Sequence, residues 1–60
     1  MDKWEYFIET IYRPDPRQQF RISDINVVLN NNGRECWELV NIIQAQSGVW
    51  LGVFKRKLVI

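Results

Sequence analysis

The sequence WELVNIIQAQSGVWLGVFKRKLV, residues 37–59, decides the fold because it predicts two strands joined by a short turn. We expect the first of these strands over Trp37–Gln44, the turn over residues 46–48 and the second strand over Val49–Val59. A connection this short makes the two strands an antiparallel hairpin. Gly52, inside the second strand, predicts a bulge or the close approach of another backbone.

The N-terminal stretch Met1–Arg13 predicts a further strand, since aromatic and β-branched side chains alternate along it with a period of two. One face carries Trp4, Tyr6, Ile8, Thr10 and Tyr12. The opposite face carries Glu5, Phe7, Glu9, Ile11 and Arg13. The first face has more apolar bulk, so we expect it to meet the core and the second to stay uncovered. Pro14 and Pro16 then end the strand, because proline donates no ladder hydrogen bond.

Between the first and second strands the sequence predicts one short helix over Asp24–Asn32. Ser23 is a suitable N-cap, and Asp24 lies in the first turn, where the helix dipole favours an acid. The apolar side chains spaced to share one helical face are Ile25, Val28 and Leu29. Gly33 suits the left-handed position that follows a helix end. A helix this short must dock on a sheet to be stable.

These elements predict an α+β fold in which residues 1–60 form one small domain with two layers. The order is β-α-β-β, with a three-stranded, mainly antiparallel sheet and one short helix on one face. We favour the strand order 1-3-2, because Val49–Phe54 is the most apolar run and suits a central strand; the order 1-2-3 is the alternative. The expected core consists of Trp4, Tyr6, Ile8, Ile25, Val28, Leu29, Trp37 and Leu39.

A chain of 60 residues is too short to bury a large core. At 7.2 kDa we expect a folded surface of about 4,100 Å², against about 10,400 Å² for the unfolded chain. Burial of the apolar share contributes ~95 kcal/mol, which the ~90 kcal/mol cost of ordering the chain nearly cancels. We therefore expect the chain to gain stability by self-association, as a dimer or a higher closed oligomer.

The inventory of side chains argues against an enzyme. There is no histidine, so the usual general base at neutral pH and the commonest transition-metal ligand are both missing. The single Cys36 cannot form an internal disulfide or a four-cysteine zinc site, and a free thiol fits a reducing cytoplasm. We predict no catalytic residues, no cofactor and no metal, and we expect Cys36 to be a small buried hydrophobe.

Neither a membrane segment nor a secretory leader is predicted. Asp2, Lys3 and Glu5 interrupt the start of the chain, and the apolar run Gly48–Phe54 is far shorter than the ~20 residues that span a bilayer. The formal net charge of +1 makes nucleic acid an unlikely partner, since nucleic-acid-binding domains are usually strongly basic.

Three segments of the chain resemble a family of small bacterial domains. They are Lys3-Trp4-Glu5-Tyr6, Leu29-Asn30-Asn31-Asn32-Gly33-Arg34-Glu35-Cys36-Trp37-Glu38-Leu39-Val40 and Phe54-Lys55-Arg56. The family is the uncharacterised domain-of-unknown-function family numbered 4177, and the resemblance covers nearly the whole chain. It implies a bacterial β-α-β-β subunit and brings no catalytic residues. Cys36 stands where the family usually has glycine, so either the backbone there needs no positive φ or the chain accepts some strain.

The predicted fold leaves one sheet face uncovered, since a single helix can cover only the other. An uncovered apolar face usually marks an interaction site, and we expect this one to carry Phe7, Ile11, Trp50 and Phe54. The leading hypothesis is a non-enzymatic module that associates with itself, and then with an unknown protein partner through a strand edge.

Two alternative functions stay open. The tryptophans could line a pocket at a subunit interface for a planar, flavin- or nucleotide-like ligand, by analogy with the shape of dodecin-type subunits. Weak nucleic-acid binding is the other alternative, with a phosphate-binding rim made of Arg13, Arg17, Arg21 and Arg34.

Overall fold

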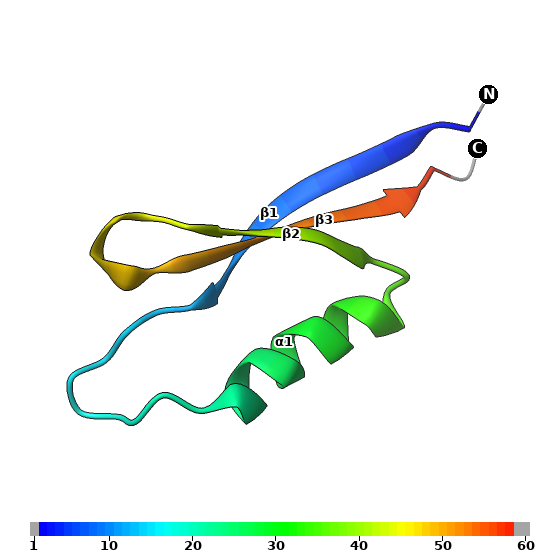
Figure 1. The fold of residues 1–60 in the computed structure, drawn as a ribbon. Coiled ribbons are helices and arrows are strands. Elements are labelled where there is room, and N and C mark those ends of the chain that lie inside the picture. Colours follow the sequence, from blue (N-terminus) through cyan, green and yellow to red (C-terminus); the bar gives the residue numbers. More distant parts are fainter. Residues whose placement is uncertain (1, 59–60) are drawn as a thin grey trace.

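A computed structural model describes residues 2–58, which form an antiparallel three-stranded sheet and one α-helix (Figure 1). The elements are β1 (Trp4–Tyr12), α1 (Ile22–Arg34), β2 (Glu38–Gln44), the 3-10 turn η1 (Gln46–Gly48) and β3 (Trp50–Lys57). The strands are ordered β1-β3-β2. The predicted α+β fold and the order 1-3-2 are therefore confirmed, and the order 1-2-3 is wrong.

The central strand β3 pairs with both neighbours, and each neighbour has one irregular position. The register shifts between Thr10 and Tyr12 on β1, and between Leu39 and Asn41 on β2. The bulges thus lie in the flanking strands, opposite Trp50–Leu51 and Val53–Phe54, and Gly52 itself pairs regularly with Glu9 and Ile42. Gly52 instead permits close packing, because a Cβ atom there would lie 2.8 Å from Cε2 of Phe54.

Helix α1 begins two residues earlier than the sequence predicts. Its N-cap is Arg21, which has an extended backbone and makes no capping hydrogen bond through its side chain. The first bond of the helix runs from the N–H of Asp24 to the carbonyl of Arg21, over 3.1 Å. Ser23 is therefore inside the helix, and the predicted cap was wrong because a good capping residue does not fix where the turn begins.

The helix ends in a Schellman motif that places Cys36 in the left-handed region. The N–H of Cys36 donates to the carbonyl of Gly33, and the N–H of Trp37 donates to the carbonyl of Asn32. Cys36 takes the position after the C-cap with φ 68°, whereas Gly33 remains helical. The chain thus accepts the strain of a side chain at a position that favours glycine.

Replacing Cys36 by glycine should stabilise the protein. Removal of the Cβ atom relieves the left-handed backbone, and we expect the free energy of unfolding to rise by about 1 kcal/mol. Thermal denaturation followed by circular dichroism measures this as an increase in Tm of about 4–8 °C. The control is Cys36→Ser, which also removes the thiol but keeps the Cβ atom, and it should leave Tm unchanged. An equal gain in both variants would assign the effect to the thiol.

The core lies between α1 and the sheet, and it is small. Its buried members are Ile11, Ile25 and Phe54, which are 5%, 8% and 1% exposed. The apolar residues packed against them are half-buried: Phe7, Tyr12, Val28, Leu29, Trp37, Leu39 and Trp50. Helix and hairpin thus contribute the core residues that the sequence predicts for them.

The two faces of β1 are the reverse of the prediction. Trp4, Tyr6 and Ile8 are 44%, 62% and 60% exposed, so they do not belong to the core. The helix covers the face that was expected to stay open: Phe7, Ile11, Trp50 and Phe54. This face also carries Glu5 and Glu9, and both carboxylates find partners there.

The partners explain why two glutamates are tolerated on the helix side. Glu5 forms an ion pair with Arg56, and Glu9 accepts a hydrogen bond of 2.8 Å from the side-chain amide of Asn32. Apolar bulk on β1 therefore does not decide which face is covered. Pairing with β3 decides it, because Phe54 lies opposite Phe7.

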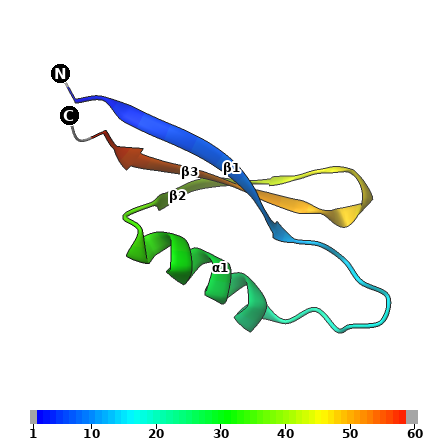
Figure 2. The same ribbon diagram turned by 180° about the vertical axis from the view of Figure 1, so that it is seen from behind.

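The sheet is covered on one side only. Figure 1 and the reverse view in Figure 2 show α1 along one side of the sheet and no other described element on the opposite side. The principal dimensions are 46 × 23 × 12 Å, and the radius of gyration is 13.2 Å. A compact domain of this length is expected near 10.4 Å. The described chain is thus a long, thin two-layer unit.

Candidate association surface

One face of the sheet points away from α1, and we call it the outer sheet face. Directly paired residues point to the same side, and Phe7, Phe54 and Leu39 are paired on the helix side. Their neighbours along each strand therefore point outward. The outer sheet face consists of Trp4, Tyr6, Ile8, Thr10, Leu51, Val53, Lys55, Lys57, Glu38, Asn41 and Ile43.

An apolar patch on the outer sheet face runs from β1 across β3 to β2, with Asn41 as a polar neighbour opposite Val53. Ile8 on β1 lies opposite Val53 on β3, and Leu51 lies between Thr10 and Ile43. The side chains on the flanking strands are open to solvent, since Ile8 is 60% and Ile43 is 42% exposed. A contiguous apolar patch of this kind is typical of a surface that binds another protein.

One end of the outer sheet face adds aromatic and charged side chains, and acidic Glu38 is paired with Lys55 there. The Lys55 ammonium lies 4.6 Å from the centre of the Trp4 ring, which is a cation–π contact. Tyr6 is paired with Lys55 and is 62% exposed. The Lys57 ammonium lies 3.4 Å from the Asp2 carboxylate. The other end of this face is formed by Thr10, Leu51 and Ile43 and is uncharged.

On the helix side, Arg56 ties the end of α1 to two strands. Its guanidinium pairs with Glu5, donates a hydrogen bond of 3.2 Å to the carbonyl of Glu35, and lies 4.2 Å from the Trp37 ring centre. Trp37 also meets Phe7 edge-on, with ring centres 4.4 Å apart. These contacts join Arg56 to the strand β1, the end of α1 and the Trp37 ring, so the cluster fits a structural role better than a reactive one.

Trp50 forms a second aromatic cluster, which holds the proline-containing loop. Its ring lies 5.3 Å from Tyr12 and 5.7 Å from Phe20, and the rings of Tyr12 and Phe20 are 4.9 Å apart. Trp50 is half-buried in these contacts, and it does not lie on the uncovered face.

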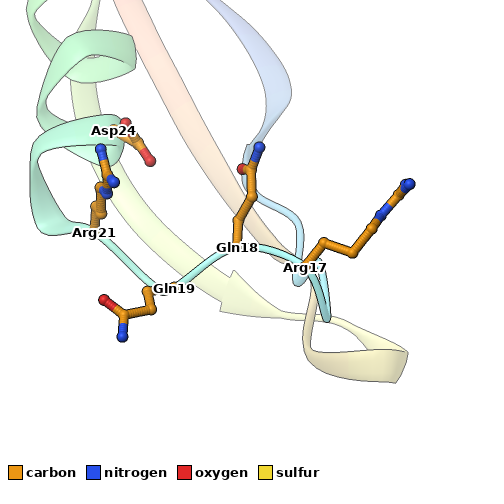
Figure 3. A pocket seen from close by; sticks show the side chains of 5 residues that line it. All are labelled: Arg17, Gln18, Gln19, Arg21 and Asp24. Carbon is orange, nitrogen blue, oxygen red and sulfur yellow. The ribbon is translucent and has the colours of Figure 1, made fainter.

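The four arginines expected to form one rim are divided, because Arg34 lies at the far end of α1, whereas Arg13, Arg17 and Arg21 line adjoining cavities at the loop. Arg21 precedes α1 and Arg34 ends it, and a helix of 13 residues separates them by about 20 Å. Arg17 is 90% exposed beside Asp15. A cavity of about 490 Å³ between the loop and the helix is lined by Arg17, Gln18, Gln19, Arg21 and Asp24. Figure 3 shows these side chains pointing in different directions, with Arg17 turned away from the others.

Cys36 is exposed and not buried as expected, because the left-handed turn after α1 projects it away from the core. Across residues 2–58, no three side chains of His, Cys, Asp or Glu gather closely enough to hold a metal ion.

Sequence reasoning missed that the outer sheet face is formed by Trp4, Tyr6 and Ile8. The signal that could have located it is in the hairpin. Alternate residues of β3 include Lys55 and Lys57, which favour the solvent side and bring their β1 partners with them.

No family model, curated protein or solved structure matches this chain. Among the described residues, no helix is long and apolar enough to cross a membrane.

Proposed function

We propose that this chain is a small, non-enzymatic association module that binds protein through the outer sheet face, first of all by self-association. The observation that carries the proposal is the exposure of Trp4, Tyr6, Ile8 and Ile43 on a sheet that is covered on its other side only. A monomer gains nothing from holding these side chains in water, whereas an interface buries them.

The solvent-accessible surface supports the same proposal. The chain exposes 5066 Å², whereas a folded monomer of 7.2 kDa is expected to expose about 4,100 Å². The excess is about 950 Å² per chain, and a standard protein interface buries about 800 Å² per partner. Association through one face thus removes the amount of surface by which this chain exceeds a stable monomer.

Substitution of Ile8 by lysine tests the proposal. The change puts an unpaired charge into the middle of the outer sheet face, and we expect association to weaken by at least a hundredfold, or about 3 kcal/mol. Sedimentation velocity over a range of concentrations measures this directly. Ile8 is 60% exposed, so the substitution leaves the core of the monomer intact.

The matched control is Val27→Lys, because Val27 is 56% exposed on α1 and lies outside the outer sheet face. This variant should associate as the unchanged protein does. The proposal fails if the unchanged chain sediments as a monomer at every concentration, or if Ile8→Lys associates normally.

Nucleic-acid binding is a second candidate, and one observation favours it. Trp4 and Tyr6 are exposed beside Lys55 and Lys57 at one end of the outer sheet face, where bases could stack and phosphates could be neutralised. A mobility-shift assay with single-stranded oligonucleotides at low and moderate salt tests it, since basic contacts weaken steeply with salt. The alternative of a tryptophan-lined pocket for a planar ligand has less support, because the tryptophans lie apart: Trp4 is on the outer sheet face, whereas Trp37 packs on Phe7 and Trp50 on Tyr12 and Phe20.

We also propose that the chain is a member of the bacterial family numbered 4177 and acts in the cytoplasm. The motif residues that carry the resemblance contact one another: Lys55 lies over Trp4, and Arg56 joins Glu5 to Trp37. These contacts support the interpretation that the motif residues stabilise the fold. The exposed free thiol of Cys36 fits a reducing compartment.

A further inference from the structure

We infer that the partner on the outer sheet face is a second copy of this chain, packed face to face with the two β3 strands antiparallel. The inference rests on the proposed function and specifies its partner and its geometry. The product is a four-layer α/β/β/α dimer, in which each α1 covers the outside and the two sheets form the middle.

The surface area favours a second copy over a small partner. The excess of about 950 Å² per chain is close to the ~800 Å² that each side of a standard interface buries. A two-fold interface uses the same patch on both chains, so one apolar face meets the burial requirement of both. Stacked sheets lie ~10 Å apart, which lets Ile8, Val53 and Ile43 interdigitate with their counterparts.

The charges on the outer sheet face select one of two symmetric arrangements. A two-fold axis parallel to β3 would place Lys55 and Lys57 against the same residues of the second copy. It would also gather every charged side chain of the face, Lys55, Lys57 and Glu38 of both copies, at one end of the interface, where like charges on the two β3 strands face each other and the charged groups lose water. This arrangement is therefore disfavoured.

An axis perpendicular to β3 avoids this repulsion. It reverses the strands, so the lysine end of one chain lies over the uncharged end of the other, formed by Thr10, Leu51 and Ile43. The aliphatic stem of Lys55 can then cover apolar surface while its ammonium stays beside the Trp4 ring. In the antiparallel arrangement, the charged end of each outer sheet face thus lies over the uncharged end of the other.

A pair of substitutions distinguishes a dimer through the face from a dimer through a strand edge. Ile8 lies on the edge strand β1 and Ile43 on the opposite edge strand β2. We expect Ile8→Lys and Ile43→Lys each to weaken the dimer at least a hundredfold in sedimentation velocity. Pairing through the β1 edge would leave Ile43→Lys dimeric, and pairing through the β2 edge would leave Ile8→Lys dimeric. Either result overturns the inference. A dimeric Ile43→Lys leaves the proposed function standing, whereas a dimeric Ile8→Lys contradicts the proposed function as well.

The direction of the strands is measured with a single spin label on Gln46→Cys in a Cys36→Gly background. Gln46 is exposed in the turn at the uncharged end of the hairpin, outside the outer sheet face. In the antiparallel dimer the two labels lie at opposite ends, more than about 30 Å apart on the rise of a strand. A parallel dimer places them within about 15 Å of each other and overturns the inference.

Failure of the proposed function gives a different result. The unchanged chain then remains monomeric at every concentration, and the label shows no defined distance between chains. Circular dichroism of each variant confirms that the monomer is folded, and the labelling experiment leaves the outer sheet face unaltered.

Discussion

Replacing Gly52 by alanine should lower the free energy of unfolding by about 2 kcal/mol, enough to unfold much of the population at moderate temperature. The added Cβ atom would lie 2.8 Å from Cε2 of Phe54 and 2.9 Å from Cγ2 of Ile11. Phe54 is 1% and Ile11 is 5% exposed, so neither can move aside into solvent. The clash therefore falls on the two best-buried residues of the core.

A thermal melt followed by circular dichroism measures the effect of Gly52→Ala as a decrease in Tm of about 10–15 °C. The change is large because a domain of this size rarely has more than ~3–5 kcal/mol of stability. Alanine also restricts the unfolded chain more than glycine, which offsets part of the loss by about 0.5–1 kcal/mol.

The matched control is Gly33→Ala. Gly33 lies inside α1, and a Cβ atom there meets nothing within 4 Å. This variant should melt at a higher temperature than the unchanged protein, because alanine is the better helix former by ~1 kcal/mol. Equal melting of Gly52→Ala and the unchanged chain would show that β1 and β3 do not pack as described.

The hairpin and the strand order could be predicted because they depend on local signals. The short turn at 46–48 forces an antiparallel pair, and the apolar run Val49–Phe54 suits a strand with neighbours on both sides. The helix was predictable for the same reason, since its apolar residues recur at helical spacing.

The faces of β1 could not be predicted from β1 alone. Both faces carry apolar residues, and the decision depends on partners far away in sequence: Phe54 lies opposite Phe7, and Arg56 and Asn32 make it possible for Glu5 and Glu9 to share that face. The greater apolar bulk of the other face carries no information about these partners. The consequence for function is direct, since Trp4, Tyr6 and Ile8, which were expected in the core, lie on the candidate interface.

The end of α1 shows the same limit. Gly33 is the better residue for a left-handed turn, yet Cys36 occupies it. The position of the turn is fixed by where Trp37 must lie to meet Phe7 and Arg56, and this is a tertiary requirement. Local preference is overruled there at a cost of about 1 kcal/mol.

The melting temperature should rise steeply with protein concentration if the outer sheet face is an interface between copies. Unfolding of a dimer releases two chains, so a thousandfold increase in concentration stabilises the dimer by about 4 kcal/mol, or about 2 kcal/mol per chain. For a domain of this size we expect Tm to rise by about 8–16 °C over that range. The free energy of unfolding per chain would then increase with protein concentration.

The Ile8→Lys variant separates this effect from the stability of the single chain. Its Tm should be low and independent of concentration, because the charge disrupts the interface while Ile11, Ile25 and Phe54 stay packed under α1. A chain whose Tm does not change with concentration would be stable as an isolated two-layer unit, in spite of its exposed sheet face. A core with three buried side chains and a rim of half-buried ones would then hold the described fold together. Such a core stabilises an isolated chain only weakly, because the free energy gained by burial and the cost of ordering the chain nearly cancel. We therefore expect Tm to depend on protein concentration.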